Sequence, residues 1–275
     1  MSFNIHNYSL KTQFIALSGI MIFGFLLVAG IVGNGKVNLD QTQSEALHAI
    51  AIKEAANQLT IEFLSARRAE KDFLLRLEEK YIARHKDIQG AIDNASAELA
   101  QQAKDNSAIL DQVHKFDINF DLYTMKFHEV TALQIEMGLD QNSGLLGSLR
   151  KSVQEVESII NTQNQKELSI LMLMMRRHEK DFLARNEEKY LQDMKKRYEE
   201  FKTTLATAAL SGDTVQKINA LMENYQKSFF LMADKRKILD QAIADLSTTY
   251  AATEPMIEAI DKIAVTTKES ALASY

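Results

Sequence analysis

The sequence predicts an all-α fold made of a few long helices. The chain has 275 residues with a single proline and ten glycines, and five of those glycines fall in the first 35 residues. Sheet folds need frequent turns, which Gly, Pro and Asn usually mark. The scarcity of such turn signals after residue 35 argues against a sandwich, a barrel or a doubly wound sheet.

Composition excludes several classes of function. The chain has no cysteine, so disulfides, thiolate metal sites and cysteine nucleophiles are ruled out. The formal charge is -5 and no basic stripe is visible, which argues against nucleic acid as a partner. The sequence contains no Gly-rich phosphate loop, nucleophile elbow or His-Glu-x-x-His motif. We therefore expect neither an enzyme nor a bound cofactor.

The N-terminal segment predicts a membrane anchor. Phe14 to Gly33 is twenty residues without a charge, and a helix of that length is about 30 Å long, which matches the hydrocarbon core of a bilayer. Asn34 and Lys36 follow it rather than a small-residue cleavage site, so retention is expected over removal as a signal peptide. The positive-inside rule then places the N-terminus in the cytoplasm and the body outside it. Residues 1–36 are thus predicted to be a cytoplasmic N-terminus and a transmembrane helix.

An internal repeat organises the rest of the chain. The stretch at 67–81 (RRAEKDFLLRLEEKY) recurs at 176–190 (RRHEKDFLARNEEKY), with twelve of fifteen positions identical at an offset of 109 residues. We call these stretches the first motif and the second motif. Self-similarity of this kind predicts two copies of one helical unit.

Periodicity locates the helices. Apolar residues step by three and four from Ala49 to Leu77, and the pattern restarts out of phase at Tyr81, so a first helix must end near Leu77–Glu79. Asn186, followed by two glutamates, reads as a helix N-cap. The predicted helices cover residues 37–77, 79–104, 107–137, 144–186, 187–210 and 213–270.

The helix lengths predict two four-helix bundles stacked end to end behind the transmembrane helix. The first and fourth helices, at about 40 residues each, are long enough to run through both bundles. The distal bundle would take residues 64–160, and the membrane-proximal bundle would take 37–63 plus 161–270. Residues 271–275 would lead towards a second transmembrane helix.

These residues resemble a known family. The doubled Arg-Arg-x-Glu-Lys-Asp-Phe-Leu-x-Arg pattern, together with the stretch 138–146 and Leu149-Arg150, is similar to the helical bimodular sensor domain of bacterial methyl-accepting chemotaxis receptors and sensor kinases. The resemblance covers residues 37–270. It implies a homodimeric receptor in the bacterial inner membrane, with its body in the periplasm and an output domain after Tyr275.

The resemblance also implies a ligand and a signal. Receptors of this family bind small organic acids such as four-carbon dicarboxylates or acetate, and a pocket is possible in each module. Binding would favour one packing of the helices and displace one of them by about 1–2 Å.

The charges that the two motifs share have two open interpretations. Glu70 and Glu179 fall on the packed seam, where a carboxylate is costly unless paired, and Arg67 and Arg176 precede them by three residues. These residues could therefore be structural ion pairs. Alternatively, an arginine of each copy could bind a ligand carboxylate. The candidate ligand-binding residues are Arg67, Arg68, Arg176, Arg177, Lys53, Asn57 and Thr60.

The sequence also leaves a metal site and a second function to consider. Glu45-x-x-His48 and Asp111-x-x-His114 have the spacing of half a di-iron site, but the predicted topology places them in different bundles, so no metal is expected. The alternative function is a membrane-anchored structural or protein-interaction bundle, or a sensor of a periplasmic binding protein, without a small-molecule ligand.

Overall fold

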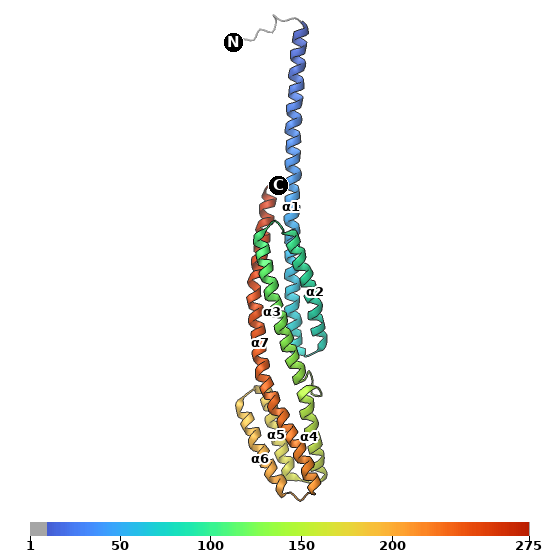
Figure 1. Cartoon of the computed structure of the whole chain (residues 1–275), viewed down its shortest axis with the longest axis vertical. Helices are drawn as coiled ribbons and strands as arrows, with labels where there is room; N and C mark the ends of the chain where they lie inside the picture. The colour runs from blue at the N-terminus through green and yellow to red at the C-terminus, as the bar shows by residue number, and fades with distance from the viewer. Residues whose placement is uncertain (1–9, 275) are drawn as a thin grey trace. The chain divides into compact units, whose positions relative to one another are not determined.

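The computed structural model describes residues 10–274, except for the side chains of residues 10, 12, 13, 16, 31–42 and 274. The described residues form helices and turns with no strand, which confirms the all-α class (Figure 1). The predicted cytoplasmic segment at residues 1–9 lies outside the described range, as does Tyr275. The helices are α1 (Leu10–Arg76), α2 (Glu79–Gln102), α3 (Ser107–Met137), α4 (Gly144–Thr162), α5 (Lys166–Arg185), α6 (Glu188–Thr207) and α7 (Gly212–Ser274).

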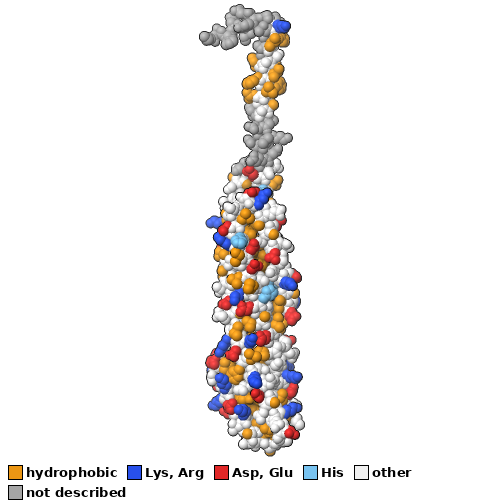
Figure 2. Space-filling model, viewed as in Figure 1, with side chains coloured by type: hydrophobic (Ala, Val, Ile, Leu, Met, Phe, Trp, Pro, Cys, Tyr) orange, Lys and Arg blue, Asp and Glu red, His pale blue; other side chains and the backbone are white. Residues whose placement is uncertain are grey.

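The membrane prediction is overturned. Helix α1 runs for 67 residues without a break, and no helix in the described part of the chain is both long enough and apolar enough to cross a membrane. The predicted transmembrane helix, and with it the inner-membrane location, are therefore corrected. The prediction rested on an absence of charge from Phe14 to Gly33, which is a weaker criterion than sustained apolarity. The large apolar side chains described from Phe14 to Val28 are exposed (Figure 2).

The predicted long fourth helix is also wrong. It is two helices, α4 and α5, separated by a turn in which Asn164 has a φ of 53°. The turn follows from a run of five polar residues, 161–165, that includes two asparagines, because Asn tolerates the left-handed conformation and is a poor helix former. Arg176 bonds Glu157 across the hairpin, so α4 and α5 pack against each other as an antiparallel pair.

The chain divides into two compact units. Unit 1 takes in the described residues of Met1–Ile61, Asn94–Val113 and Met256–Tyr275. Unit 2 takes in Glu62–Asp93 and His114–Pro255. These ranges differ from the predicted bundles because α4 and α5 form a hairpin within unit 2, so that α1 and α7, rather than α1 and a fourth helix, are the long helices. Both motifs belong to unit 2.

Small aliphatic side chains form the core of unit 1, and no described aromatic residue is buried there, in contrast to unit 2. Its segments of α1, α2, α3 and α7 each contribute at three- and four-residue steps, as a helical packing seam requires. The buried residues include Ala49, Ile52, Ala56, Leu59, Leu99, Ile109, Val113, Ile260 and Ala264.

Aromatic rings dominate one part of the core of unit 2. Phe63 of α1 meets Phe116 of α3 edge-on at 5.5 Å between ring centroids and stacks on Tyr250 of α7 at 4.7 Å. Phe73 of α1 meets Phe127 of α3 at 5.8 Å. Such pairs contribute beyond the area that they bury, because ring edges and faces carry opposite partial charge. They hold the ends of α1 and α3 against α7.

The other part of unit 2 comprises α4, α5, α6 and the first half of α7 (Figure 1). Phe182 of α5 meets Phe229 of α7 at 5.7 Å, and Phe201 of α6 is fully buried. Asn224 of α7 donates a hydrogen bond to Ser152 of α4 at 2.9 Å. Helix α7 thus contacts both parts of unit 2.

The two motifs fold into the same helix–turn–helix. Leu77 and Asn186, which are equivalent in the repeat, both adopt the left-handed conformation, with φ of 53° and 51°. Each donates its backbone N–H to the carbonyl four residues earlier, at 2.7 Å in both copies. Asn186 is therefore the C-cap of α5, whereas the sequence had predicted it as the N-cap of the next helix. The repeat encodes a helix end rather than a helix start.

Candidate functional site

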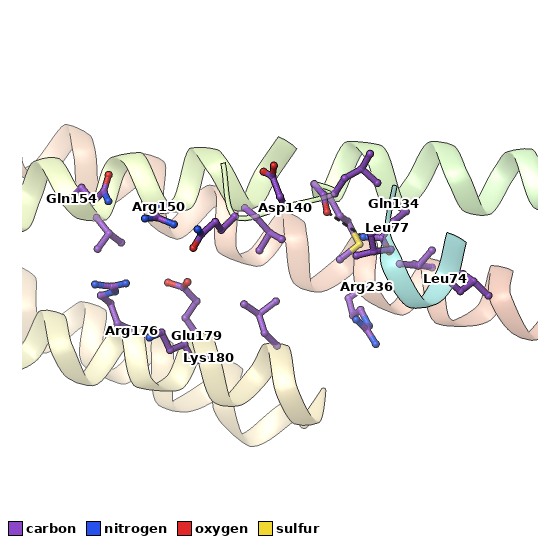
Figure 3. Close-up of a pocket in the computed structure, with 18 of the residues that line it drawn as sticks. Leu74, Leu77, Gln134, Asp140, Arg150, Gln154, Arg176, Glu179, Lys180 and Arg236 are labelled. Atoms are coloured by element: carbon purple, nitrogen blue, oxygen red, sulfur yellow. Dashed lines mark hydrogen bonds between the residues drawn. The ribbon is translucent and has the colours of Figure 1, made fainter. Parts of the chain in front are cut away.

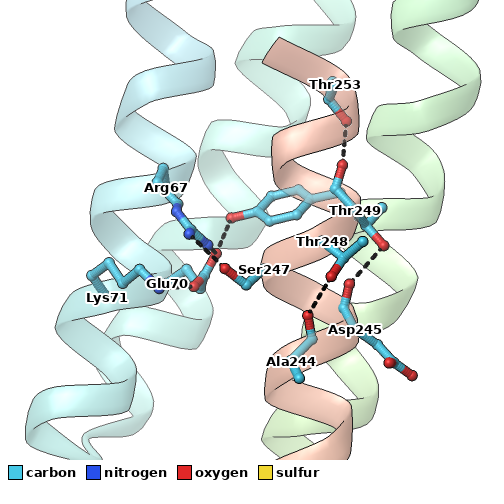
Figure 4. Close-up of polar contacts among 10 residues, drawn as sticks. Arg67, Glu70, Lys71, Ala244, Asp245, Ser247, Thr248, Thr249 and Thr253 are labelled. Carbon is cyan, nitrogen blue, oxygen red and sulfur yellow. Dashed lines mark hydrogen bonds and ion pairs between the residues drawn. The ribbon is translucent and has the colours of Figure 1, made fainter.

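Arg67 of the first motif is fully engaged by residues of unit 2. Arg67 donates to Glu70 at 2.5 Å and to Ser247 of α7 at 3.3 Å, and its guanidinium carbon lies 4.2 Å from the centroid of the Tyr250 ring. Figure 4 shows Arg67 and Glu70 on α1 turned towards Ser247. The guanidinium is thus held by a carboxylate, a hydroxyl and an aromatic face at once.

Glu70 is the centre of this network. Its side chain is only 1% exposed, and it accepts hydrogen bonds from Arg67 and from the Tyr123 hydroxyl, the latter at 2.9 Å. Lys71 lies 3.0 Å from its other oxygen. Burial, followed by the charge of Glu70, raises the pKa of Tyr123 far above its usual value, so the phenol stays a donor. Arg67, Glu70 and Tyr123 therefore form a closed structural network, while Arg68 of the same motif lies exposed outside it.

His85 of α2 packs beside this network and carries an unsatisfied group. Its ring stacks on Phe127 at 4.1 Å between centroids and lies 5.6 Å from the Tyr123 ring. The side chain is 1% exposed, and its Nε2 atom finds no hydrogen-bond partner among the described residues. Burial, and to a lesser degree the nearby His128, lowers the pKa of His85 to about 4. His85 is therefore buried in its neutral form.

This burial predicts an acid-sensitive stability. The pKa of His85 is lower in the folded state than its usual 6.5 in the unfolded chain, so protonation favours unfolding as the pH falls through that interval. Between pH 7.5 and 5 the loss from this residue should be about 2 kcal/mol. Urea unfolding at both pH values measures this loss. Between pH 7.5 and 5 the free energy of unfolding of the parent should fall by about 2 kcal/mol more than that of H85F. Equal pH dependence in the two proteins would contradict the assignment.

The second motif uses the same residue types with different partners. Arg176 bonds both oxygens of Glu157 on α4, at 3.1 and 3.4 Å, rather than forming the predicted pair with Glu179. Glu179 instead accepts a 2.7 Å hydrogen bond from the Tyr225 hydroxyl. The α4–α5 hairpin causes the difference, because it brings Glu157 against Arg176.

The tyrosines that satisfy the two glutamates are not equivalent in the repeat. At the offset of 109, Tyr225 corresponds to Phe116, and Tyr123 corresponds to Met232. Relative to the repeat, the tyrosine that donates to the glutamate therefore lies seven residues, or about two helical turns, later in the first copy than in the second. Both copies nevertheless keep the bond from a tyrosine hydroxyl to the glutamate. Burial raises the pKa of Glu179, and the Tyr225 hydroxyl and the Arg176 charge partly oppose that rise.

A pocket of about 880 Å³ opens beside the second motif, within unit 2 (Figure 3). It lies among the end of α1, the link between α3 and α4, the α4–α5 hairpin and α7. Figure 3 shows Arg150 of α4 facing Arg176 and Glu179 of α5 across the space between those helices. The charged residues of its lining are Arg150, Arg176, Lys180, Arg236, Asp140 and Glu179.

The cations of the pocket differ in how they are engaged. Arg176 is bound to Glu157, and Arg236 donates to Asp240 at 2.9 Å. Arg150 is half-buried, yet no hydrogen bond or ion pair involves its side chain within the described part of the chain. A half-buried guanidinium without such partners leaves some of its N–H donors unsatisfied, because burial removes water that would otherwise accept hydrogen bonds from them. Arg150 is therefore available to an anion.

The other predicted ligand residues are not part of the lining of this pocket. Arg68 is exposed on α1, and Arg177 is exposed with its Nε atom 3.7 Å from Asp181. Lys53 forms an ion pair with Asp261 and a 2.8 Å hydrogen bond to Asn57.

Thr60 and the residues around Lys53 belong to a different part of the fold. The Thr60 hydroxyl bonds the carbonyl of Ala56 in its own helix at 2.9 Å. Thr60, Lys53 and Asn57 all belong to unit 1, whereas the four arginines belong to unit 2, so neither unit brings all seven predicted residues together. Among the described residues, no cluster of His, Asp or Glu has the geometry to hold a metal ion.

Sequence reasoning missed Arg150, Lys180 and Arg236 as site residues. Arg150 appeared only as part of the pattern shared with the sensor family. A signal was present, because Arg150 lies between Leu146 and Val153 beside the apolar seam of its helix, where a cation is half-buried. Comparison with protein-family models and with curated protein sequences finds no match for this chain. The resemblance to bimodular sensors stays a prediction.

Proposed function

We propose that this chain is a sensory helical domain that binds a small carboxylate in the pocket between α4, α5 and α7. The observation that carries the proposal is Arg150, a half-buried guanidinium without a partner in the described structure, which faces Arg176 across the pocket. A ligand carboxylate between them would accept charge-assisted hydrogen bonds, which are about twice as strong as neutral ones.

The surroundings of Arg150 suit an anion receptor. Glu157 holds Arg176 from one side at 3.1 Å, which fixes the guanidinium before a ligand arrives. Preorganisation of this kind lowers the entropy that binding must overcome. Four cations and two carboxylates line the pocket, so its lining carries a net positive charge. The proposal therefore assigns the second motif to binding and the first, with its engaged Arg67, to structure.

Binding would be transmitted by helix displacement. Arg150 belongs to α4 and Arg176 to α5, so one carboxylate bound to both favours a closed hairpin. Leu239 and Ile243 of α7 also line the pocket, and α7 continues as one helix to Ser274. A shift of α7 by about 1–2 Å, typical of helix movements in signalling proteins, would transmit ligand binding from the pocket to the C-terminal end of that helix.

The test measures the free energy of unfolding of the full chain with and without ligand, for the parent and for R150Q. Acetate, succinate and 3-phenylpropionate would be titrated, and an acid that binds should add about 2.7 kcal/mol to the free energy of unfolding at 100 times its dissociation constant. R150Q should weaken that acid by about 10- to 100-fold, because a hydrogen bond to a charged group contributes about 1.5–3 kcal/mol.

R68Q is the matched control, since Arg68 is an exposed arginine of the other motif. It should leave the affinity unchanged. Equal losses in R68Q and R150Q, or no stabilisation by any of the three acids, would refute binding at this pocket and favour a purely structural bundle.

A further inference from the structure

We infer that the ligand of this pocket is an amphipathic monocarboxylate, with one acid group on an aromatic or branched apolar body, rather than a short dicarboxylate. This inference rests on the proposed function and specifies its ligand class. Three features of the pocket lead to it: its size, the position of charged and apolar side chains along its lining, and the number of cations that have no carboxylate partner in the described structure.

Size argues against a very small ligand. The pocket measures about 880 Å³, which lies towards the upper end of the range typical of sites for drug-sized molecules. A four-carbon dicarboxylate or acetate would occupy a small part of it and leave the rest to water. Water beside the apolar side chains of that remainder would be poorly satisfied, because it would lack polar partners there. A larger ligand with an apolar body would displace this water.

The lining is charged at one end and mixed at the other. Figure 3 shows Arg150, Arg176 and Glu179 at the first end and Leu74 and Leu77 at the second, with Gln134 and Arg236 beside those leucines. We call the surface of Leu74 and Leu77 the apolar region. Several apolar side chains of the lining are only half-buried, so they expose apolar surface that a ligand could cover. They are Leu74, Leu77, Leu139, Leu146, Leu183 and Ile243.

Charge limits the ligand to one buried carboxylate. Arg176 and Arg236 are each bound to an acid of the chain, and Lys180 is exposed. Arg150 is thus the one half-buried cation of this lining without a described partner. Within this lining a second ligand carboxylate would find only the exposed Lys180 without a described partner, and it would meet the negative charges of Glu179 or Asp140. The site is therefore matched to a ligand with a single acid group.

The experiment compares three probes by calorimetry on the full chain: 3-phenylpropionate, succinate and 3-phenylpropan-1-ol. The first combines one carboxylate with an apolar body, the second has two carboxylates and no such body, and the third lacks the acid. We expect 3-phenylpropionate to bind at least tenfold more tightly than either of the others. Tighter binding of succinate, or equal binding of the alcohol, would overturn the amphipathic assignment.

L77N tests the apolar region without disturbing the turn. Its repeat equivalent is Asn186, which holds the same left-handed backbone with φ of 51°, so asparagine suits this position. We expect L77N to weaken 3-phenylpropionate about tenfold, a typical effect of removing an apolar contact from a binding pocket, and to leave succinate unchanged. L75N is the control, because Leu75, two residues earlier in the last turn of α1, is 79% exposed and does not line the pocket.

The outcomes separate this inference from the proposed function. Succinate binding that depends on Arg150 and is insensitive to L77N would overturn the amphipathic ligand and keep a carboxylate site. Failure of both acids to bind would overturn both. An equal loss in L75N and L77N would show that the effect of L77N is not local, and would overturn the assignment of the apolar region.

Discussion

Replacing Glu70 by alanine should reduce the free energy of unfolding by about 3–5 kcal/mol, which is the usual cost of removing one partner from a buried charge pair. The substitution removes the acceptor of both Arg67 and Tyr123. The Tyr123 hydroxyl, in a fully buried residue, would then lack a partner, and Arg67 would keep only Ser247 and the Tyr250 ring. Urea unfolding of the full chain measures the loss.

Two further variants separate the charge from the hydrogen bonds. E70Q keeps the size and an acceptor oxygen but removes the charge, so its free energy of unfolding should lie between that of the parent and that of E70A. E179A removes the equivalent glutamate of the second motif, which is less buried and lacks a bonded arginine. It should cost less than E70A. Equal costs would mean that the two motifs are energetically alike, against the division into a structural and a binding copy.

Helix ends were predictable where local chemistry alone determines them. The phase shift between Leu77 and Tyr81 located the end of α1, and scarce turn signals predicted an all-α chain. The turn between α4 and α5 was missed because it contains neither glycine nor proline. Its left-handed residue is Asn164, and an asparagine within a polar run is a much weaker signal than Gly. One missed turn changed which helices pack together.

The site could be predicted only where its residues are close in sequence. Arg67 and Glu70 lie three residues apart on one helix, so their ion pair follows from spacing. The bond from Arg176 to Glu157 depends on the hairpin, and the position of Arg150 depends on how α4 faces α5. Near-identity of the two motifs suggested equal contacts, but the contacts of Arg67 and Arg176 differ because their neighbours differ.

The substitution G144A should destabilise the chain by about 3 kcal/mol and weaken binding of 3-phenylpropionate. Gly144 begins α4 with a φ of 56°, a conformation that costs other residues about 1 kcal/mol or more. A methyl group there would lie 2.5 Å from the carbonyl oxygen of Glu136 and 2.6 Å from the backbone nitrogen of Gly138. Both obstacles are backbone atoms, so the link between α3 and α4 must move.

That movement would reach the pocket, because the link residues from Gly138 to Gln141 form part of its lining. The control is G90A, the same substitution inside α2, where an added methyl group meets nothing within 4 Å. G90A should stabilise the chain by roughly 0.5–1 kcal/mol, since alanine loses less conformational freedom in a helix than glycine does. Urea unfolding and calorimetry on both variants should therefore give shifts of opposite sign in stability and a change in affinity for G144A alone. If G144A kept the parent affinity while losing stability, the link would have no part in shaping the site.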